Sequence, residues 1–530
     1  SGPARGRVLR GAPDRPWHYA DMKWEPFLAT SWVVVEYTIK IAALGTVPEN
    51  RRPSSSTAWL LLIFLLPVVG FPLYFFLGSP WVHGRRLQQQ VIATEAAQKM
   101  MQGLPTVPAG ARPSVHLDSV LQMNRRLTGL PCVTGEVVAL HGDSAATYAA
   151  MARIIDAAEH HVHVEFYIQS WDEVTDVFYS ALERAAARGV TVRLLVDHLG
   201  SRKYPGWRRL GRRFSEAGIQ WRLMMPLLPL RRRFRRPDLR NHRKILIVDG
   251  RRAFIGSHNI IDPTYRLRSN VRAGRVWQDL SVEVAGAIVM EAEAVFAMDW
   301  YFEAGELVDL LELVPGPDGK ALAGEGVIAE RAVVGTPAPP PGRPDAVVNA
   351  MQLVPSGPGY PTEPNLRMFL SLIQNATRRI SITSPYFIPD EALLSAMTTA
   401  AYRGVKVELF VGLESDHLIV NHAQRSYYSA LLTAGVRIYR YPAPTVLHAK
   451  YMTVDDEVGV IGSSNMDFRS FALNYEVMLL AFGGDLDDLL RDNDAFYRSV
   501  SSELTAEEWA KEPWWRRYID NVFRLMSAVL

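Results

Sequence analysis

Cysteine is almost absent from the chain: Cys132 is the only one among 530 residues. A disulfide within the chain is therefore excluded, and nothing in the cysteine content indicates an oxidising compartment. Net charge is small as well, because 58 basic residues face 55 acidic ones and leave +3. This near balance of charges argues against bulk nucleic-acid binding. The positions at which basic residues cluster carry more information than their total number.

Apolar stretches long enough to cross a bilayer are scarce, and both lie in the first 80 residues. Residues 57–78 contain no charge, whereas residues 27–47 contain Glu36 and Lys40 one helical turn apart. At ~1.5 Å per residue, each stretch could span a ~30 Å hydrocarbon core as a helix. We expect a two-helix transmembrane hairpin within 24–80, with a re-entrant or interfacial helix as the alternative for the first stretch. No small-residue cleavage site follows either stretch, so neither is typical of a signal peptide.

Basic residues are distributed unequally around this hairpin. Arg51 and Arg52 lie in the short connection between the two stretches. More basic residues flank the two outer ends: Arg5, Arg7, Arg10, Arg15, Lys23, Arg85 and Arg86. Because cytoplasmic segments of membrane proteins are enriched in Lys and Arg, we expect a multi-pass protein of the cell membrane whose catalytic region is cytoplasmic.

One pattern occurs twice in the chain, His-x-Lys-x4-Asp-x6-Gly-Ser-x-Asn. The spacing is identical in both copies, and they lie 448 − 242 = 206 residues apart, which suits a duplicated domain. The first set is His242, Lys244, Asp249, Gly256, Ser257 and Asn259; the second is His448, Lys450, Asp455, Gly462, Ser463 and Asn465. Two surface hairpins that match by chance are the alternative, and twelve matching positions count against it.

Each copy begins in a strand rich in apolar and β-branched residues and ends at an acidic turn. Since successive side chains of a strand alternate between faces, His242 and Lys244 share a face, and Asp249 falls on the other. The second copy follows the same rule. We therefore expect both aspartates to fix turns or pair with cations instead of contacting a phosphate. The serines and asparagines are expected to donate to the oxygens of an anion, which the glycines allow to approach closely.

This residue set suits phosphodiester exchange without a metal. One neutral imidazole attacks phosphorus, and the other, protonated, gives its proton to the leaving alkoxide. The lysines hold the oxygens on which charge builds in the transition state. A second alcohol then displaces the phosphohistidine, and hydrolysis is the variant in which water enters. A lysine beside each histidine disfavours a bound cation, and no Cys or paired carboxylate accompanies the motifs, so we expect no metal and no other cofactor.

An attacking imidazole needs its second nitrogen held, and a carboxylate usually does this. A strand-like run downstream of each motif offers one, Asp279 after the first and Glu476 after the second. We predict that these carboxylates orient the histidines. Ordinary strand-edge carboxylates are the alternative.

These residues resemble the phospholipase D superfamily, which is defined by the paired His-Lys-Asp motif, and the whole chain is similar to its bacterial cardiolipin synthases. The resemblance implies a phosphatidyl-histidine intermediate, formed from one phosphatidylglycerol and resolved by a second to give cardiolipin and glycerol. It also implies that His242 is the nucleophile and His448 the acid and base. Asn241 precedes His242 where a glutamine is expected. Further similar segments are the amino-terminal hairpin, 356–359, 385–387 and the Trp-rich basic end after Trp509.

Helix, glycine and strand alternate in both halves; Arg188-Gly189-Val190, for example, recurs as Arg403-Gly404-Val405. This alternation predicts an α/β fold, a duplicated phospholipase D-like domain whose two mixed-sheet halves carry helices and are related by a pseudo-twofold axis. We expect a tail at 1–23, the transmembrane hairpin at 24–80, a helical juxtamembrane linker at 81–130, half 1 at 131–312, an inter-half linker at 313–345, half 2 at 346–505 and an amphipathic C-terminal segment at 506–530.

The halves differ just before their histidines. Gly218 precedes His242 by 24 residues, whereas Gly435 precedes His448 by 13, so the first half carries 11 more. The insertion contains leucines and then a basic run, Arg231, Arg232, Arg233, Arg235 and Arg236. An apolar and then basic segment beside a phosphate site is expected to contact anionic headgroups, at ~1 kcal/mol per basic residue. A solvated charged loop is the alternative.

Other functions remain as alternatives. A phospholipase D-type hydrolase that releases phosphatidic acid would carry the same motifs, because pocket shape and water exclusion choose the acceptor. A nuclease has little use for a membrane hairpin, and stacking platforms for bases are not evident, so we expect no nucleic-acid partner. A dead scaffold is disfavoured because both motifs are complete. The expected partners are phosphatidylglycerol and the anionic lipid bilayer; the acceptor alcohol, and whether the chain forms a homo-oligomer, stay open.

Overall fold

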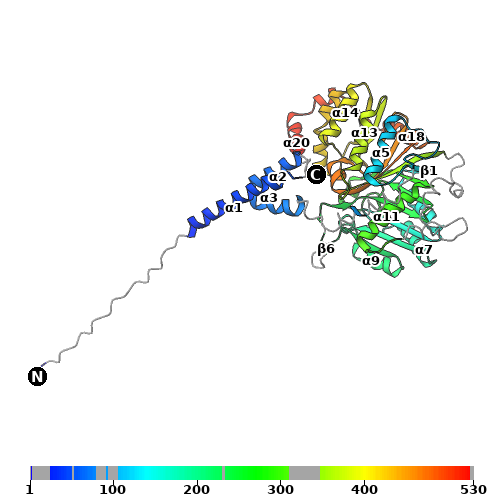
Figure 1. Ribbon diagram of the computed structural model, residues 1–530, viewed down its shortest axis with the longest axis horizontal. Helices are drawn as coiled ribbons and strands as arrows, with labels where there is room; N and C mark the ends of the chain where they lie inside the picture. The colour runs from blue at the N-terminus through cyan, green and yellow to red at the C-terminus, as the bar shows by residue number, and fades with distance from the viewer. Residues whose placement is uncertain are drawn as a thin grey trace. The chain divides into compact units, whose positions relative to one another are not determined.

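The computed structural model of the chain describes residues 2, 24–49, 53–78, 91–92, 105–228, 233–234, 236–308 and 347–525. The chain divides into two compact units, Ser1–Ser79 and Pro80–Leu530, whose elements are labelled in Figure 1. The inter-half linker expected at 313–345 lies outside the described residues, as do the tail at 1–23, apart from Gly2, and much of 81–104.

The first unit is helical where it is described. Its elements are α1 (Trp24–Thr46), α2 (Pro53–Leu65), α3 (Pro67–Leu73) and the π-helical turn η1 (Tyr74–Gly78). Pro67 begins α3 because proline has no N–H with which to continue the preceding helix. Ala43, Val47, Ile63 and Tyr74 form a small buried cluster among these helices.

The first expected membrane span, 27–47, largely coincides with α1, and the second, 57–78, contains most of α2 together with α3 and η1. In the described part of the chain, none of the helices is both long enough and apolar enough to cross a bilayer. Lys40 pairs with Glu36 one turn away in α1, as their spacing suggested. The spans themselves stay a prediction.

The second unit contains both motif-bearing halves. The strands of its first half are β1 (Val133–His141), β2 (His161–Phe166), β3 (Thr191–Asp197), β4 (Gln220–Met224), β5 (Leu227–Leu228), β6 (Arg233–Phe234), β7 (Arg240–Asn241), β8 (Lys244–Val248), β9 (Arg252–Gly256), β10 (Val276–Gln278) and β11 (Ser281–Ala285). The strands of its second half are β12 (Val348–Ser356), β13 (Arg379–Thr383), β14 (Phe387–Ile388), β15 (Lys406–Gly412), β16 (Arg437–Tyr441), β17 (Thr445–Leu447), β18 (Tyr451–Val454), β19 (Val458–Gly462), β20 (Met466–Asp467), β21 (Asn474–Phe482) and β22 (Ser502–Leu504).

One mixed sheet of 16 strands extends through both halves. Its order is β22-β16-β15-β13-β18-β19-β21-β12-β1-β11-β9-β8-β2-β3-β4, and β7 pairs with β21 outside this path. A parallel group lies toward each end, β2-β3-β4 in one half and β13-β15-β16 in the other, and the strands between these groups pair antiparallel. The order therefore repeats outward from the central β1-β12 pair, which confirms the predicted α/β duplication in a mixed sheet.

Helices cover this sheet in both halves (Figure 1). α5 (Val115–Thr128) lies within the helical linker expected at 81–130, and its buried side chains pack into the core of the second half. The helices of the first half are α6 (Ser144–Asp156), α7 (Asp176–Ala187), α8 (His198–Arg202), α9 (Trp207–Glu216), α10 (Arg268–Ala273) and α11 (Ile288–Ala304). Those of the second half are α13 (Pro364–Asn375), α14 (Glu391–Tyr402), α15 (Leu418–Arg425), α16 (Tyr428–Ala434), α17 (Phe468–Ala472), α18 (Leu486–Val500), α19 (Ala506–Ala510) and α20 (Trp514–Arg524). α7 and α14 end just before Gly189 and Gly404, whose φ angles of 90° and 89° favour glycine and turn the chain into the next strand.

The two halves share a hydrophobic core in addition to their own. One cluster lies within the first half and includes Phe178 and Leu194. A second cluster lies mainly in the second half, and a third joins residues of both halves, for example Val282 and Phe296 with Leu479. Buried apolar surface therefore fixes the halves against each other, and this positions the two motifs.

Candidate active site

Two short parallel strand pairs join the halves next to the motif histidines. β7 pairs with β21, and the His242 N–H donates to the Tyr475 carbonyl at 2.8 Å. β10 pairs with β17, and the His448 N–H donates to the Gln278 carbonyl at 2.8 Å. His242 therefore lies beside Glu476, the residue after Tyr475. In the same way, His448 lies beside Asp279, the residue after Gln278.

The orienting carboxylates are exchanged between the halves. Glu476 of the second half contacts Nδ1 of His242 at 2.9 Å. Asp279 of the first half contacts Nδ1 of His448 at 2.5 Å. Sequence reasoning picked both carboxylates but left their pairing open. When Nδ1–H donates to a carboxylate, Nε2 is the imidazole nitrogen left for attack or proton transfer.

The motif serines hold these carboxylates. Ser257 donates to Oδ1 of Asp279 at 2.6 Å, and Ser463 donates to Oε2 of Glu476 at 2.6 Å. We expected their hydroxyls to contact the anion, whereas in the structure both are used to position the groups that orient the histidines. The preceding Gly462 allows this approach, since a Cβ there would lie 2.2 Å from the Val477 carbonyl oxygen.

The motif asparagines are buried beside the serines. Asn259 accepts from the Ile168 N–H at 3.1 Å and donates to the Tyr265 hydroxyl at 2.8 Å, so its amide links three segments of the first half. Asn465 is also buried, and its side-chain oxygen has no described hydrogen-bond partner.

The motif lysines are buried and point their ammonium groups back toward the histidines. Lys244 donates to the His242 carbonyl at 2.5 Å, and Lys450 donates to the His448 carbonyl at 2.6 Å. Burial, with a contribution from the neighbouring Lys450 charge, lowers the pKa of Lys244 to about 7. Burial likewise lowers the pKa of Lys450 to about 8. The two ammonium groups act on each other electrostatically, and an anion bound between them would stabilise both positive charges.

The two histidine–carboxylate pairs differ electrostatically. Burial and the charges of Lys244, Lys450 and His448 hold the pKa of His242 well below its ordinary value, and burial raises the pKa of its partner Glu476 to about 7. Burial would also raise the pKa of Asp279, but the adjacent His448 holds it well below the ordinary value. Burial and the Lys450 charge lower the pKa of His448 as well, but the charged Asp279 offsets part of this, so His448 is the more readily protonated of the two imidazoles.

The motif aspartates lie at tight turns. Asp249 and Asp455 adopt positive φ angles of 52° and 55°. Asp249 accepts from the backbone N–H groups of 159–161, each at 2.8 Å, and Asp455 accepts from those of 377–379 at 2.6 to 2.9 Å. These contacts tie each motif hairpin to the start of the antiparallel strand beside it, β2 or β13, as the turn-fixing interpretation requires.

Little of the basic insertion is described. Arg231, Arg232 and Arg235 lie outside the described residues, and only the backbone of Arg233 is described. Arg236 is buried and pairs with Asp238. Its guanidinium is therefore not exposed for a headgroup, in contrast to our expectation for the whole run.

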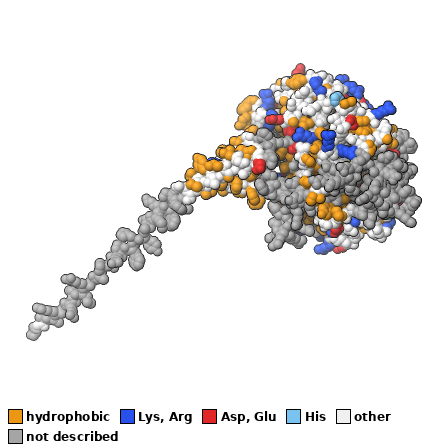
Figure 2. Space-filling model, in the orientation of Figure 1, with side chains coloured by type: hydrophobic (Ala, Val, Ile, Leu, Met, Phe, Trp, Pro, Cys, Tyr) orange, Lys and Arg blue, Asp and Glu red, His pale blue; other side chains and the backbone are white. Residues whose placement is uncertain are grey.

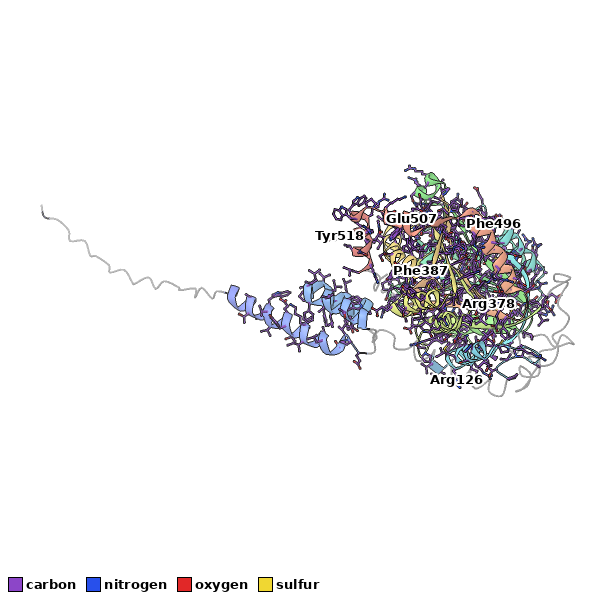
Figure 3. The ribbon with its side chains drawn as sticks, turned by 90° about the horizontal axis from the view of Figure 1, so that it is seen from above. Arg126, Arg378, Phe387, Phe496, Glu507 and Tyr518 are labelled. Carbon is purple, nitrogen blue, oxygen red and sulfur yellow. The ribbon has the colours of Figure 1, made fainter. Side chains whose placement is uncertain are left out.

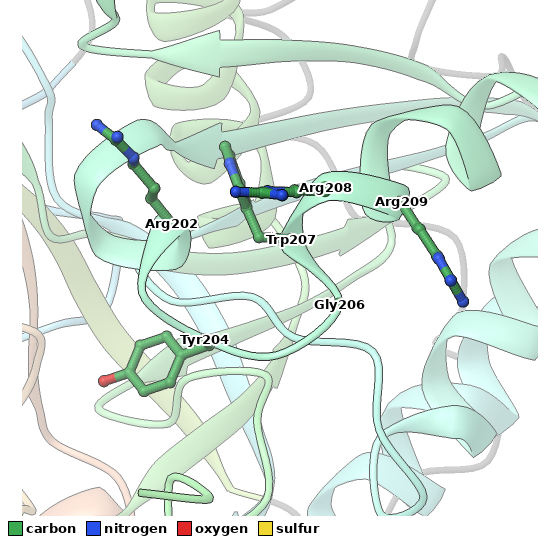
Figure 4. A pocket seen from close by; sticks show the side chains of 6 residues that line it. All are labelled: Arg202, Tyr204, Gly206, Trp207, Arg208 and Arg209. Atoms are coloured by element: carbon green, nitrogen blue, oxygen red, sulfur yellow. The ribbon is translucent and has the colours of Figure 1, made fainter.

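A second basic region of the first half is well described. It is a pocket with a volume of about 530 Å³, drawn in Figure 4 and lined by Arg202, Tyr204, Gly206, Trp207, Arg208 and Arg209. In the described part of the chain, no carboxylate pairs with these arginines. The pocket includes no residue of the two motifs.

Three buried side chains outside the motifs have the composition of a metal site. Glu293 of α11 contacts Nε2 of His161 at 2.6 Å and Nδ1 of His163 at 2.7 Å. These are hydrogen-bond distances, and the carboxylate receives one ring N–H from each histidine. These hydrogen bonds join β2 to α11, although Nδ1 of the buried His161 has no partner among the described residues.

Sequence reasoning missed Tyr167. Its ring lies edge-on to that of His242, with centroids 4.9 Å apart, and the Lys244 ammonium is 5.6 Å from the Tyr167 centroid. The position at the carboxyl end of a parallel strand could have indicated it, since sites of α/β sheets form there. Two buried pairs flank His242 in the sequence, Asn241 with Glu165 and Arg243 with Asp299. No sequence pattern indicated either pairing.

The fold and the paired sites define a duplicated phospholipase D-like enzyme, and comparison with known sequences identifies the family. The profile described as "Cardiolipin synthase, PLD-like domain" matches 151–300 and 369–492, and "Phospholipase_D-nuclease N-terminal" matches 38–79. The chain belongs to the cardiolipin synthase family of the phospholipase D superfamily, so the resemblance drawn from the motifs is confirmed.

Relatives match along nearly the whole chain. Cardiolipin synthase A of Serratia proteamaculans is 31% identical over 524 residues, 95% of this chain and 99% of its own length. Cardiolipin synthase A of Yersinia pseudotuberculosis is 31% identical over 519 residues, with the same coverage. The solved phosphatidylserine synthase of Haemophilus influenzae shares the fold, with a TM-score of 0.54 at 15% identity over 77% of this chain and 99% of that protein.

Proposed function

We propose that the protein is a cardiolipin synthase, a phosphatidyltransferase that moves the phosphatidyl group of one phosphatidylglycerol to a hydroxyl of a second and releases glycerol. Its full-length similarity to cardiolipin synthase A supports the substrate class. The observation that carries the chemistry is the exchange of carboxylates between the halves, which presents two oriented imidazoles and two lysines in one site.

The first step forms a phosphatidyl-histidine. Nε2 of neutral His242 attacks the phosphorus, the bond from phosphorus to the glycerol oxygen breaks, and His448 gives its Nε2 proton to that oxygen. The ammonium groups of Lys244 and Lys450 stabilise the negative charge that develops on the phosphoryl oxygens in the transition state.

The second step reverses the roles with a new alcohol. Neutral His448 removes the proton from the hydroxyl of a second phosphatidylglycerol, whose oxygen attacks phosphorus as the bond to His242 breaks. The pKa is lowered for both imidazoles, but further for His242, while the charged Asp279 counters the lowering at His448; this difference supports His242 as nucleophile and His448 as acid. Both imidazoles end in their starting states, so the site is ready for another turnover.

We propose further that the enzyme acts at the cell membrane from the cytoplasmic side. The apolar stretches of the first unit and the basic residues outside them support this placement. The arginines of the pocket in Figure 4, which have no carboxylate partner among the described residues, are suited to anionic headgroups. No oligomer is required, since one chain supplies both imidazoles.

The test is a product assay with the full chain reconstituted in vesicles that contain phosphatidylglycerol. Lipid mass spectrometry and a glycerol assay should show cardiolipin and glycerol in equal amounts, and neither with His242→Ala or His448→Ala. Phosphatidic acid in place of cardiolipin would mean that water is the acceptor, and the protein would then be a hydrolase of the same family.

A further inference from the structure

The carboxyl-terminal helix α20 exposes an unusual number of aromatic side chains. Trp514 is 74% exposed, Trp515 is 48% exposed and Tyr518 is 65% exposed. Figure 3 shows Tyr518 at the outer edge of the second unit. Large aromatic rings normally gain stability by burial, so three exposed rings on one short helix indicate an apolar or interfacial environment.

Basic side chains share this helix with the aromatic ones. Arg516 and Arg517 lie between Trp515 and Tyr518, and no described carboxylate pairs with Arg517. In Figure 2, hydrophobic and basic side chains are intermixed over the part of the surface that α20 forms. Tryptophan and tyrosine with neighbouring arginines are the composition of segments that lie at the headgroup level of a bilayer.

The aromatic residues are not covered by the rest of the unit. Between α20 and helices α14 and α16 lies a groove of about 990 Å³, and Trp514 and Tyr518 are among the residues that line it. Trp509, in contrast, is buried in the core of the second half. The exposed tryptophans of this region are therefore those of α20.

The orientation of α20 is fixed by its contacts with α15. The buried Asp520 contacts Nδ1 of His422 at 2.6 Å and Nε of Arg425 at 3.3 Å. Phe523 stacks on the His422 ring with centroids 5.2 Å apart. α15 adds exposed apolar side chains of its own, including Leu418 at 68%. We call Leu418, Ile419, Trp514, Trp515, Arg517 and Tyr518 the α15–α20 face.

One end of this face follows a segment whose Asp416 charge acts on the catalytic Lys450. α15 follows the carboxyl end of β15 through the segment 413–417, in which Asp416 accepts from the Tyr386 hydroxyl at 2.7 Å. In the same segment, Glu414 pairs at 3.8 Å with Arg275, the residue before β10, which leads to Asp279. A surface held by the α15–α20 face would therefore adjoin the site.

We propose that the α15–α20 face docks the catalytic unit onto a bilayer that contains anionic lipid, so that the site draws its lipid substrates from that surface. The inference rests on the proposed function, because only a lipid substrate gives such docking a purpose. Charge favours a bilayer over a second copy: Arg516 pairs with Glu512, but Arg517 has no described carboxylate partner, and a twofold contact centred on α20 would bring it close to its own counterpart.

A spin label can read the depth of this face. In a Cys132→Ala background, the full chain carries a nitroxide at Tyr518→Cys, and Phe496→Cys provides a matched control, because Phe496 is an exposed aromatic residue on α18. In phosphatidylglycerol-containing vesicles, the label at 518 should be more accessible to oxygen than to a water-soluble nickel complex, and the label at 496 the reverse. Equal access of the nickel complex to both sites would overturn the proposal, as would spin–spin coupling between copies at 518.

Kinetics give a second measurement. Trp514→Ser, Trp515→Ser and Tyr518→Ser together should raise the KM for phosphatidylglycerol in vesicles by about tenfold. The effect on a short-chain phosphatidylglycerol that stays monomeric in water should be much smaller, and Phe496→Ser should match the wild type in both assays. Equal losses with both substrates would contradict docking. If the wild type makes no cardiolipin, the proposed function fails, but the spin-label result still decides whether the face meets the bilayer.

Discussion

Asp279 of the first half and His448 of the second half are joined by a hydrogen bond of 2.5 Å. This contact and its counterpart between Glu476 and His242 make each half incomplete without the other. The catalytic dependence is therefore reciprocal: a change in one half is expected to disable the imidazole of the other.

Asp279→Asn tests this dependence. The amide has nearly the shape of the carboxylate but no negative charge, so it cannot stabilise the protonated form of His448, and kcat should fall by about 10³-fold. The measurement is initial cardiolipin formation at saturating phosphatidylglycerol, with thermal unfolding to verify the fold. Asp494→Asn is the control, because Asp494 is buried in the second half and accepts from Tyr451 at 2.7 Å outside the site. A similar loss of kcat in both variants would point to general damage.

The buried lysines predict the alkaline limb of the pH profile. Burial lowers the pKa of Lys244 to about 7 and that of Lys450 to about 8, so the free enzyme loses these positive charges as pH rises through that range. Accordingly, kcat/KM should decline above about pH 7 to 8. A bound phosphodiester is negative and raises both pKa values, so the decline in kcat should begin at higher pH. Identical alkaline limbs in the two profiles would rule out the lysines as their source.

The fold class and the site followed from the sequence because the motif repeats with identical spacing. Periodicity placed His242 and Lys244 on one face, and the turn chemistry of Asp249 followed from its seven-residue offset. The exchange of Asp279 and Glu476 did not follow, since it depends on two parallel strand pairs of two or three residues each. Such pairs form only after the halves have packed, and no local pattern records them.

The serines illustrate the same limit. A hydroxyl beside a histidine and a lysine suggests contact with the anion, yet Ser257 is bound by Asp279, a residue 22 positions away. Arg236 was expected at the surface because its neighbours are arginines, but the structure buries it against Asp238. In both places a tertiary partner decides the role of a polar side chain, and sequence alone does not identify that partner.

A substrate with a good leaving group can show which imidazole attacks. Phosphatidyl-p-nitrophenol needs no acid to release its alcohol, so His448→Ala should still form the phosphatidyl enzyme on His242 but should lack the base that activates the acceptor. We expect one equivalent of p-nitrophenol in a burst, and peptide mass spectrometry should place the phosphatidyl group on His242. His242→Ala should give no burst. A burst in that variant, with the modification on His448, would reverse the two roles.

The last prediction separates folding from catalysis at Asp249. Its carboxylate accepts three backbone N–H groups at 2.8 Å, and it is not in contact with either imidazole among the described hydrogen bonds. Asp249→Ala should therefore lower the free energy of unfolding by roughly 3 kcal/mol, at about 1 kcal/mol per lost bond. Denaturant melts measure this loss, while kcat per folded molecule should stay within a few-fold of the wild type. Asp249→Asn keeps an acceptor oxygen and tolerates the φ of 52°, so it should recover part of the stability. A variant of normal stability but without activity would instead make Asp249 part of the catalytic chemistry.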